Sequence, residues 1–522
     1  MSDKTAAPER EQFSGQFGFL MSAIGSAVGL GNIWRFPGVA YTNGGGAFLI
    51  PYIVALLTAG IPILLLDYAL GHRYRGSAPA VFRRLGKKFE FVGWLQVMIC
   101  VAIMCYYVVV LAWATRYVGF SMNLEWESAE SPAAFFVGDF LHLTDPGFTL
   151  AIDWAVFWPL IVLWVLVLAV MVTRVNRGLE LLNKIGVPLL LVMFLTLVVR
   201  AVFLPGAMEG LSAFFTPNWA ALADPAVWVA AYTQIFFSLS IAFGIMLTYA
   251  SYLRSRANLV PTGMVAAFAN SSFELLAGFG VFAALGFMAH TAGVGIDDLP
   301  ALTGVGLSFF TFPAIISSMP GGAFFGTLFF GSLLIAGFTS LVSILEVTIA
   351  AIREKFALGR PAAVAIVVGV GFVVSIVLFA TTNGLNALDV VDAFTNNIAL
   401  LAAAVFECIV VVFVVRNVRD LQHHLNQTST LHVGAWWRWV LVLNPIVLAY
   451  VFVVTAVRYW STGYDPASYP MDFNLVFGWG TVLFIVLGAA VVTLLRWRTE
   501  VDRFTPLPLD PYLNRSGEEV SA

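Results

Sequence analysis

The chain has 522 residues, of which 60% are hydrophobic and only 11% are charged, and its formal net charge is -3. Soluble domains carry about 25% charged residues, so this chain cannot cover itself with a water-compatible surface. The composition excludes a cytosolic enzyme and a disordered scaffold, and the slightly acidic balance offers no basic face to nucleic acid.

Twelve apolar stretches are long enough to cross a bilayer, whose hydrocarbon core of about 30 Å needs about 20 helical residues. In chain order, spans are predicted at 17–40, 46–71, 91–119, 150–172, 180–203, 226–251, 261–290, 322–351, 362–381, 388–415, 437–458 and 474–496. A further apolar stretch, 301–318, is interrupted by glycine and proline and is predicted to be a re-entrant or capping segment. The polar N-terminus predicts no cleaved signal peptide. The predicted fold is an all-α polytopic membrane protein with 12 transmembrane helices.

The placement of basic residues orients these spans. Of the 27 Lys and Arg residues, 23 lie in the two tails or in loops that follow even-numbered spans. The opposite loops at 121–150 and 291–321 contain neither residue type. By the positive-inside rule, both termini are expected in the cytoplasm of a cell (plasma or inner) membrane that the chain crosses many times.

Two spans are interrupted near mid-membrane. The first contains five small or polar residues within eight positions: Gly25, Ser26, Gly29, Gly31 and Asn32. In the sixth, small residues alternate through FFSLSIAFG: Ser238, Ser240, Ala242 and Gly244. Small residues also permit close helix packing, which is the alternative interpretation of either span alone. A broken helix survives in lipid only where it lines a polar cavity, so the pair predicts a site at the breaks.

The positions of the broken spans predict an inverted repeat. Five crossings separate the first span from the sixth, and an odd number inverts the second set of five relative to the first, as in alternating-access transporters. The predicted organisation is a cytoplasmic tail at 1–12, a first repeat at 13–203, a second repeat at 204–417 with an extracellular loop segment at 299–318, two further helices within 418–496 and a cytoplasmic tail at 497–522.

Several motifs make the family resemblance specific. They are AIGSAVGLGNIWRFP at 23–37, NGGGAFLIPY at 43–52, the Tyr106-Tyr107 pair, QIFFSLS at 234–240, YASY at 249–252 and AGFTS at 336–340. In this order the chain, from about residue 10 to 410, resembles the neurotransmitter:sodium symporter family, in its bacterial amino-acid branch. The resemblance implies a sodium-coupled symporter.

The resemblance also implies two sodium sites. The first would use the carbonyl of Ala27, the side chains of Asn32, Ser238 and Asn270, and the substrate's carboxylate. The second would use the carbonyls of Gly25, Val28 and Ala336 and the hydroxyls of Thr339 and Ser340. Sodium is a hard cation that favours oxygen ligands, which fits these donors. Ala336 and Thr339 are i,i+3 and share a helical face.

A mostly apolar substrate pocket is implied beside these sites. Its expected residues are Ser26, Ala27, Leu30, Gly31, Ile103, Tyr107, Phe237, Ser238, Ser240, Phe243, Ser340 and Ile344. The Tyr107 hydroxyl and the amides around Leu30 and Gly31 would bind a carboxylate. Gly29 stands where monoamine-carrying relatives have Asp, so the substrate should bring its own carboxylate. Ser26 and Ala242 depart from the family pattern at the pocket floor, and the particular amino acid stays open.

Gates and a hinge follow from the same resemblance. Arg35 and Asp392 would form the outer gate, since a charge embedded in a span needs a partner, although Arg35 could instead reach the interface. Arg10, Glu354 and Tyr252 would form the inner latch. Gly178 and Pro188, ten residues apart, are expected to let the fifth helix unwind, but they also suit an ordinary helix start.

Glu274 leads to a prediction about chloride dependence. Asn270 and Glu274 are i,i+4 and face the same side of their helix. Tyr52, Gln234 and Ser238 match the chloride-binding cluster of chloride-dependent relatives, which have Ser where this chain has Glu274. The carboxylate would replace chloride, and the empty carrier would return with a proton. The alternative is a structural glutamate bonded to Gln234 and Tyr52 throughout.

The predicted function is a chloride-independent, sodium-coupled symporter of neutral, apolar amino acids, embedded in the lipid bilayer and working by alternating access. Na⁺ is the expected cofactor, at two sites, and a small amino acid is the expected partner; nucleic acid is excluded and protein partners are not predicted. No catalytic constellation lies within the spans, so an enzyme is not expected. The alternatives are a channel, a non-transporting sodium-dependent amino-acid sensor and a transporter of another small zwitterionic solute.

Overall fold

The computed structural model describes residues 11–299 and 304–509, and the regular structure of these residues is helical apart from two isolated β-bridges. By length and composition, ten helices in this part of the chain could cross a membrane. They are Gly46–Tyr74, ending in α5 (Ile61–Tyr74); Lys87–Asn123, with α7 (Glu90–Asn123); α9 (Trp154–Val172); α10 (Leu179–Val202); α14 (Leu259–Ala292); α17 (Gly322–Phe356); Arg360–Phe379, with α18 (Arg360–Val374); Gly384–Val415, with α19 (Gly384–Phe394) and α20 (Leu401–Cys408); α22 (Ala435–Ser461); and Met471–Leu494, with α24 (Gly480–Leu494). The prediction of an all-α polytopic membrane protein is confirmed.

The first predicted span is broken, as expected. It consists of α1 (Gln16–Ala27) followed by α2 (Leu30–Trp34) and α3 (Phe36–Thr42), and the two parts are bent by 52°. The amide of Gly29 donates to Asn32 Oδ1 at 2.9 Å instead of continuing α1. The last carbonyls of α1 therefore lack the helical partners that would normally satisfy them.

The sixth predicted span is broken as well. Its halves are α12 (Pro225–Ser238) and α13 (Ile245–Ser251), and residues 239–244 between them are not helical. Ser240, Ala242 and Gly244 have φ values of 53°, 62° and 72°. For Ser and Ala this left-handed backbone costs roughly 1–2 kcal/mol each, so the surrounding packing must hold the segment. Counted as one span, α12 and α13 would bring the total to the predicted twelve, which stays a prediction.

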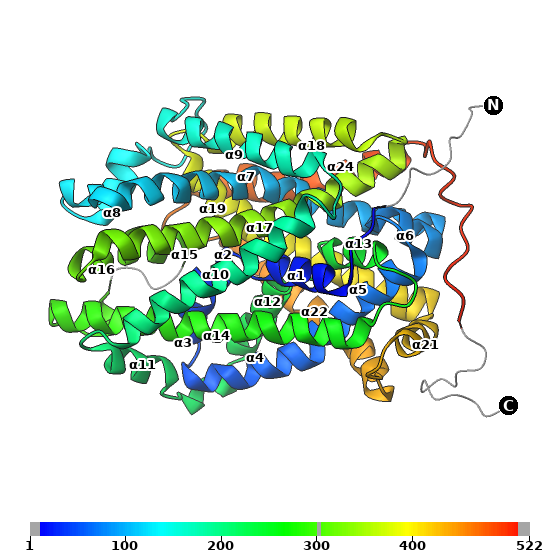
Figure 1. Ribbon diagram of the computed structural model, residues 1–522, viewed down its shortest axis with the longest axis horizontal. Helices are drawn as coiled ribbons and strands as arrows, with labels where there is room; N and C mark the ends of the chain where they lie inside the picture. The colour runs from blue at the N-terminus through cyan, green and yellow to red at the C-terminus, as the bar shows by residue number, and fades with distance from the viewer. Residues whose placement is uncertain (1–10, 300–303, 510–522) are drawn as a thin grey trace.

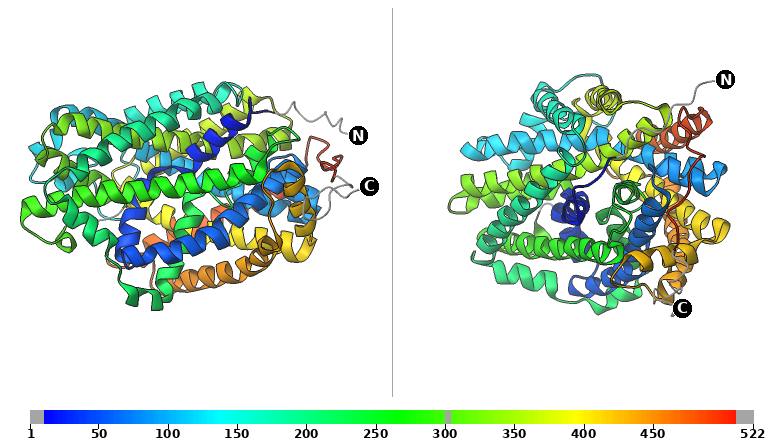
Figure 2. Two further views of the ribbon diagram at one scale, coloured as in Figure 1. Left: turned by 60° about the horizontal axis from the view of Figure 1, so that its bottom comes forward. Right: turned by 45° about the vertical axis from the view of Figure 1, so that its right-hand side comes forward.

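The broken helices lie at the centre of the molecule. In the right-hand view of Figure 2, the dark blue α1 and the green α13 are surrounded by the other helices. α7 and α17 pack against each other along their lengths beside the broken helices (Figure 1). In the most apolar stretch of the span that contains α7, 94% of the residues are buried. The corresponding fraction is only 17% for the span that ends in α24. The peripheral helices therefore expose their apolar surface, as lipid contact requires.

Several short helices connect the spans. They are α6 (Ala78–Leu85), α8 (Pro132–Ala134), α11 (Ala207–Phe215), α15 (Gly304–Gly306), α16 (Phe312–Ser318) and α21 (Val418–Thr428), whereas the three-residue α23 (Met471–Phe473) begins the last span. The stretch predicted as a capping segment at 301–318 is described from residue 304, and 304–318 is an apolar helix too short to be counted as a span. Residues 300–303 lie outside the described residues.

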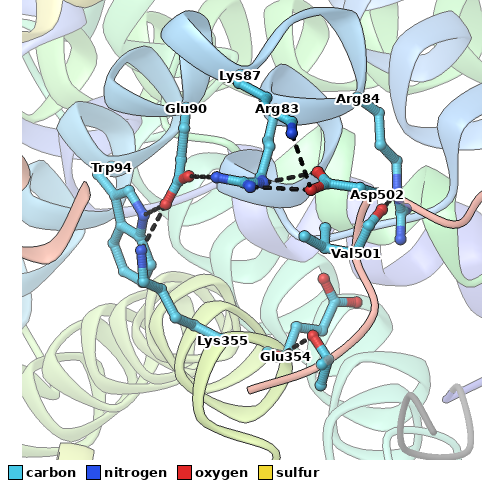
Figure 3. Close-up of polar contacts among 10 residues, drawn as sticks. Arg83, Arg84, Lys87, Glu90, Trp94, Glu354, Lys355, Val501 and Asp502 are labelled. Atoms are coloured by element: carbon cyan, nitrogen blue, oxygen red, sulfur yellow. Dashed lines mark hydrogen bonds and ion pairs between the residues drawn. The ribbon is translucent and has the colours of Figure 1, made fainter. Parts of the chain in front are cut away.

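The segment 495–509 crosses the end of the molecule at which the described chain begins (Figure 1). Asp502 binds Arg83 through two hydrogen bonds of 2.8 and 3.0 Å. Arg83 in turn binds Glu90 at 2.7 Å, and Glu90 binds Lys355 at 2.5 Å (Figure 3). This part of the predicted C-terminal tail is therefore tied to α6, α7 and α17, while residues 510–522 lie outside the described chain.

Candidate ion and substrate site

A cavity of about 40 Å³ lies between the two helix breaks. The twelve residues predicted to line a substrate pocket all line it: Ser26, Ala27, Leu30, Gly31, Ile103, Tyr107, Phe237, Ser238, Ser240, Phe243, Ser340 and Ile344. Five further residues complete the lining and were not among the predicted pocket residues: Gly29, Asn32, Tyr106, Ile245 and Asp392. α7 and α17 each contribute residues four positions apart, which share a helical face. The structure thus brings the predicted set together; their contact with a substrate stays a prediction.

One corner of the cavity collects hydrogen-bond donors. The amide of Leu30 donates to the Tyr107 hydroxyl at 3.4 Å. A Cβ atom at Gly29 would lie 3.1 Å from that hydroxyl and 3.5 Å from the hydroxyl of Ser340. Since Leu30 donates to the Tyr107 oxygen, the hydroxyl proton is available for another acceptor. This corner can therefore hold a carboxylate, and the absence of a side chain at position 29 keeps it open.

The aromatic side of the cavity depends on a second glycine. A Cβ atom at Gly31 would lie 2.2 Å from the ring of Phe237, so only glycine allows this ring to pack against α2. The guanidinium carbon of Arg35 lies 5.0 Å from the centroid of the same ring, within cation–π distance. Phe237 thus stands between the cavity and the outer charged residue.

The residues predicted for the first sodium form one buried cluster. Asn32 Nδ2 donates to Asn270 Oδ1 at 2.8 Å, and Asn270 Nδ2 donates to the Ser238 hydroxyl at 3.1 Å. At most 2% of each of these residues is exposed. Amide and hydroxyl oxygens in a dry site are suitable ligands for a hard cation, so the donor set fits sodium.

The residues predicted for the second sodium lie where α1 ends beside α17. The Gly25 carbonyl has lost the amide of Gly29 as a helical partner, because that amide binds Asn32. The Thr339 hydroxyl donates to the Ala336 carbonyl at 2.9 Å, which leaves its oxygen lone pairs available to a cation. Carbonyl and hydroxyl oxygens from two helices also fit sodium.

Asn183 on α10 was missed by sequence reasoning. A Cβ atom at Gly25 would lie 2.0 Å from Asn183 Oδ1, and this oxygen is buried without a hydrogen-bond donor among the described residues. An isolated asparagine in an apolar helix carries no signal that would have identified it. Nearby, Gly178 precedes α10, and the helix continues unbroken through Pro188. The predicted hinge is thus wound in this structure, and its unwinding stays a prediction.

The predicted chloride-replacing group is also assembled. Gln234 Nε2 donates to Glu274 Oε1 at 2.6 Å, and the Tyr52 hydroxyl donates to Glu274 Oε2. The Tyr52 hydroxyl also lies 2.8 Å from the Ser271 hydroxyl. Glu274 has no exposed surface. These contacts suit both a chloride-replacing carboxylate and a structural glutamate.

The predicted outer gate residues face a vestibule of about 510 Å³ above the cavity. Both Arg35 and Asp392 line it, but no ion pair joins Arg35 to a carboxylate of the described chain within 4.0 Å. Asp392 instead accepts hydrogen bonds from Tyr106 at 2.6 Å and Asn396 at 2.8 Å. The two residues are placed to meet if the vestibule narrows.

Replacing Asp392 with Ala tests this gate. Without the carboxylate, Arg35 would be buried unpaired whenever the vestibule closes, so we expect the uptake rate to fall at least about tenfold while the substrate Kd changes less than about threefold. Asp389→Asn is the control, because Asp389 lies one turn away and binds Tyr464 and Tyr469. Equal losses of uptake and binding would mean that Asp392 supports the fold rather than a gate.

On the side predicted to face the cytoplasm, a hydrogen-bond network is centred on Glu346. The Tyr252 hydroxyl donates to Glu346 Oε1 at 2.8 Å, and Arg360 binds the same carboxylate through both terminal nitrogens at 3.1 and 2.8 Å. Glu11 binds Arg353 at 3.1 Å. Sequence reasoning identified Tyr252 but did not find this network, since Arg360 lies beyond the end of α17.

The predicted inner latch is only partly described. Arg10 lies outside the described residues. Glu354 accepts hydrogen bonds from the amide and hydroxyl of Ser77 at 2.9 and 2.8 Å. Phe13 packs against Tyr249 and Tyr252, with ring centroids 5.5 and 6.2 Å apart. The described contacts on this side are therefore the packing of Phe13 against two tyrosine rings and the Glu346 network, and their role as a latch stays a prediction.

Replacing Glu346 with Gln tests the inner closure. The change removes the carboxylate that binds both terminal nitrogens of Arg360 and leaves only Glu11, at 3.6 Å, as a counter-charge, and breaking a buried ion pair in this way typically costs about 3–5 kcal/mol. We expect a cysteine placed at Ser343, one turn from Glu346, to react at least about tenfold faster with a thiol reagent added to the cytoplasmic side. Glu90→Gln removes a buried carboxylate of another network and is the control. Equal reaction rates in the two variants would contradict a sealing role for Glu346.

Comparison with known proteins finds matches over most of the chain. The profile of the sodium:neurotransmitter symporter family matches residues 10–134 and 122–500. A protein of Methanocaldococcus jannaschii described as an uncharacterized sodium-dependent transporter is 37% identical over 492 residues, covering 93% of this chain and 96% of its own. The sodium- and chloride-dependent taurine transporter of Rattus norvegicus is 29% identical, with 94% and 86% covered. The human sodium- and chloride-dependent creatine transporter 1 is 30% identical, with 92% and 82% covered.

Proposed function

Because the chain belongs to the sodium:neurotransmitter symporter family, we propose that it couples sodium to the uptake of neutral, apolar amino acids by alternating access. Members of this family are transporters rather than enzymes. The observation that carries the substrate proposal is the cavity between the breaks, where an apolar lining surrounds one corner of carboxylate-binding groups. Its charged lining residue, Asp392, lies on the vestibule side and is already bound by Tyr106 and Asn396.

Two sodium ions would contribute differently. At the first site, formed by Ala27, Asn32, Ser238 and Asn270, the cation would neutralise the substrate's carboxylate. At the second, between α1 and α17, it would hold the broken span against α17. The chain supplies only neutral oxygens at both sites, so a monovalent cation suits them better than a divalent one.

The substrate class has one strong competitor. The relatives named as taurine and creatine transporters carry small zwitterionic solutes by their names, and such a solute would also place an anionic group near Tyr107. We favour an apolar amino acid because Ile103, Phe243 and Ile344 line the cavity and would receive an apolar side chain. A non-transporting, sodium-dependent sensor on this fold is the alternative from another class.

We also propose that transport is chloride-independent, although the taurine and creatine relatives are named as chloride-dependent. Glu274 would provide a fixed negative charge beside the first sodium and the substrate's amine. After sodium leaves, a buried carboxylate favours its neutral form, so the empty carrier would return with a proton. Proton antiport would then be part of the cycle.

The proposed setting is a cell membrane with both termini in the cytoplasm. The basic residues that support this orientation gather near the end where 11–14 and 495–509 lie, as the Glu11–Arg353 and Arg83–Asp502 ion pairs illustrate. The two five-helix repeats at 13–203 and 204–417 would then rock against each other around the broken helices.

Competition for uptake into proteoliposomes tests the substrate proposal. Purified protein would be supplied with labelled alanine, leucine or methionine, and unlabelled neutral amino acids, taurine, creatine and monoamines would compete. We expect apolar amino acids to compete and monoamines to fail, because position 29 lacks a carboxylate. Competition by taurine or creatine alone would replace the amino-acid proposal with the zwitterion alternative, and sodium-dependent binding without uptake would support the sensor.

A further inference from the structure

The segment 495–509, called the strap below, lies across the ends of two spanning helices. It directly follows α24, contains no helix and is drawn in red in Figure 1. Pro506 and Pro508 fix their own φ angles and favour an extended backbone for the residues before them. The backbone groups of the strap are therefore available for hydrogen bonds to other elements.

The strap caps the end of α17. This helix stops where Ala357 takes a left-handed φ of 54°. The last carbonyls of a helix receive no donor from a following turn. Here the Arg498 amide donates to the Lys355 carbonyl at 2.9 Å, and the Thr499 hydroxyl donates to the Glu354 carbonyl at 2.7 Å. Removal of the strap would take these donors away from α17.

The strap also covers the side chain of Lys355, which has no exposed surface and binds Glu90 at 2.5 Å. The ammonium nitrogen lies 5.4 Å from the ring centroid of Trp94 and 5.2 Å from that of Trp497, within cation–π distance of both. Glu90 and Trp94 belong to α7, whereas Trp497 belongs to the strap and is itself buried. The strap thus supplies one wall of the site that holds the end of α17.

The other end of the strap reaches α5 and α6. The Leu507 amide donates at 3.0 Å to the carbonyl of Arg73, in the last turn of α5. Arg84 of α6 donates to the Val501 carbonyl at 3.2 Å (Figure 3). The guanidinium carbon of Arg84 also lies 4.1 Å from the ring centroid of Phe504. One continuous segment therefore joins the end of α5 to the end of α17.

These two helices flank α13, the second half of the broken sixth span, which packs against both of them. A Cβ atom at Gly71 of α5 would lie 1.9 Å from the Leu247 carbonyl oxygen of α13, so the two backbones are in close contact. On α17, Glu346 accepts a hydrogen bond from Tyr252, which directly follows α13. By fastening α5 to α17, the strap resists movement of α13 away from them.

We propose that the strap is a lock that keeps the cavity between the breaks closed on the side where the strap lies. With the strap bound, α5 and α17 hold α13 in place. Release of the strap uncaps both helices, uncovers the Lys355 ammonium and lets α13 move, which opens the cavity on this side. The effect of the lock on transport rests on the proposed alternating access, whereas the lock itself requires neither substrate nor sodium.

Truncation of the chain tests the lock. Ending the chain after Leu494 removes the strap, and ending it after Leu509 keeps the strap and is the matched control. In both chains a cysteine replaces Ser343 on α17, and its reaction with a thiol reagent added on the strap side is timed without substrate or sodium. We expect the reaction to be at least about fivefold faster without the strap and to keep the full-length rate in the control. Equal rates in the two truncations would overturn the proposal.

A cysteine at Leu385 distinguishes opening on one side from general loosening of the fold. Leu385 lines the vestibule on the other side of the cavity. Opening on the strap side alone should not make this cysteine react faster, because the two sides of an alternating-access carrier do not open together. Faster reaction at both positions in the chain that ends at 494 would overturn the proposal.

If the chain that ends at 494 does not fold, two substitutions in the full-length chain replace it. Trp497→Ala removes the aromatic wall beside the ammonium, and Thr499→Val removes one donor to α17 with little change in shape. The double variant should raise the reaction rate at position 343 at least about threefold. Arg503→Ala is the control, since Arg503 binds Glu500 within the strap itself at 3.1 Å. An equal increase in the control, or no increase in the double variant, would overturn the proposal.

Discussion

Replacing Thr339 and Ser340 together with Ala is expected to raise the sodium concentration needed for half-maximal binding at least tenfold, or about 1.4 kcal/mol. These residues supply the side-chain oxygens proposed for the second sodium, and the remaining ligands are backbone carbonyls that the substitution leaves in place. The Thr339 hydroxyl bonds to the carbonyls of Ile335 and Ala336 on its own helix, so its loss should leave α17 intact. Sodium titration of substrate binding measures the effect.

A matched control lies on the same helix. Ser343 and Thr348 are buried hydroxyl residues of α17 that belong to neither proposed sodium site. The Ser343→Ala, Thr348→Ala double variant should therefore keep the wild-type sodium dependence. An unchanged sodium dependence in the Thr339, Ser340 variant, or an equal change in the control, would show that the second site is placed wrongly.

Replacing Glu274 with Ser is expected to make a chloride-independent transporter chloride-dependent. The wild-type carboxylate accepts hydrogen bonds from Tyr52 and Gln234 in a fully buried position. Removing it leaves these donors and the neighbouring sodium site without a negative charge, and a chloride ion can supply one. We expect uptake by the variant to fall at least about tenfold when gluconate replaces chloride, and the wild type to be unaffected.

Glu274→Gln distinguishes this explanation from a structural role. Glutamine keeps the size of the side chain and removes only the charge, so it fills the space that chloride would need, and chloride should not restore its activity. Wild-type uptake that stops in gluconate would contradict the assignment. Equal activity of the Ser variant in both salts would indicate that Glu274 is a structural glutamate.

The sequence predicted the helices and both breaks because these features are local. Glycine at positions 25, 29 and 31 and alternating small residues at 238–244 weaken a helix wherever it is placed. Hydropathy set the spans to within a few residues; α17 is the largest difference, because it continues to Phe356 past the predicted end at 351. Pro188 shows the limit of such signals, since α10 runs through it without a break.

The side-chain networks could not be predicted, because they join helices that are distant in sequence. Glu346 carried no local sign that Arg360 would bind it from the next helix. Asn183 beside Gly25 is a second case. Periodicity finds the buried face of a helix, but not which buried faces meet.

Sodium-driven accumulation in proteoliposomes is the most direct test of the proposed coupling. Vesicles containing the purified protein would receive an inward sodium gradient, and the internal concentration of a labelled apolar amino acid would be followed against the external one. We expect transient accumulation above the external concentration with sodium and none with potassium. It should also be lost in the Thr339, Ser340 variant at the same sodium concentration. Equilibration without accumulation, or equal accumulation in potassium, would contradict sodium-coupled symport.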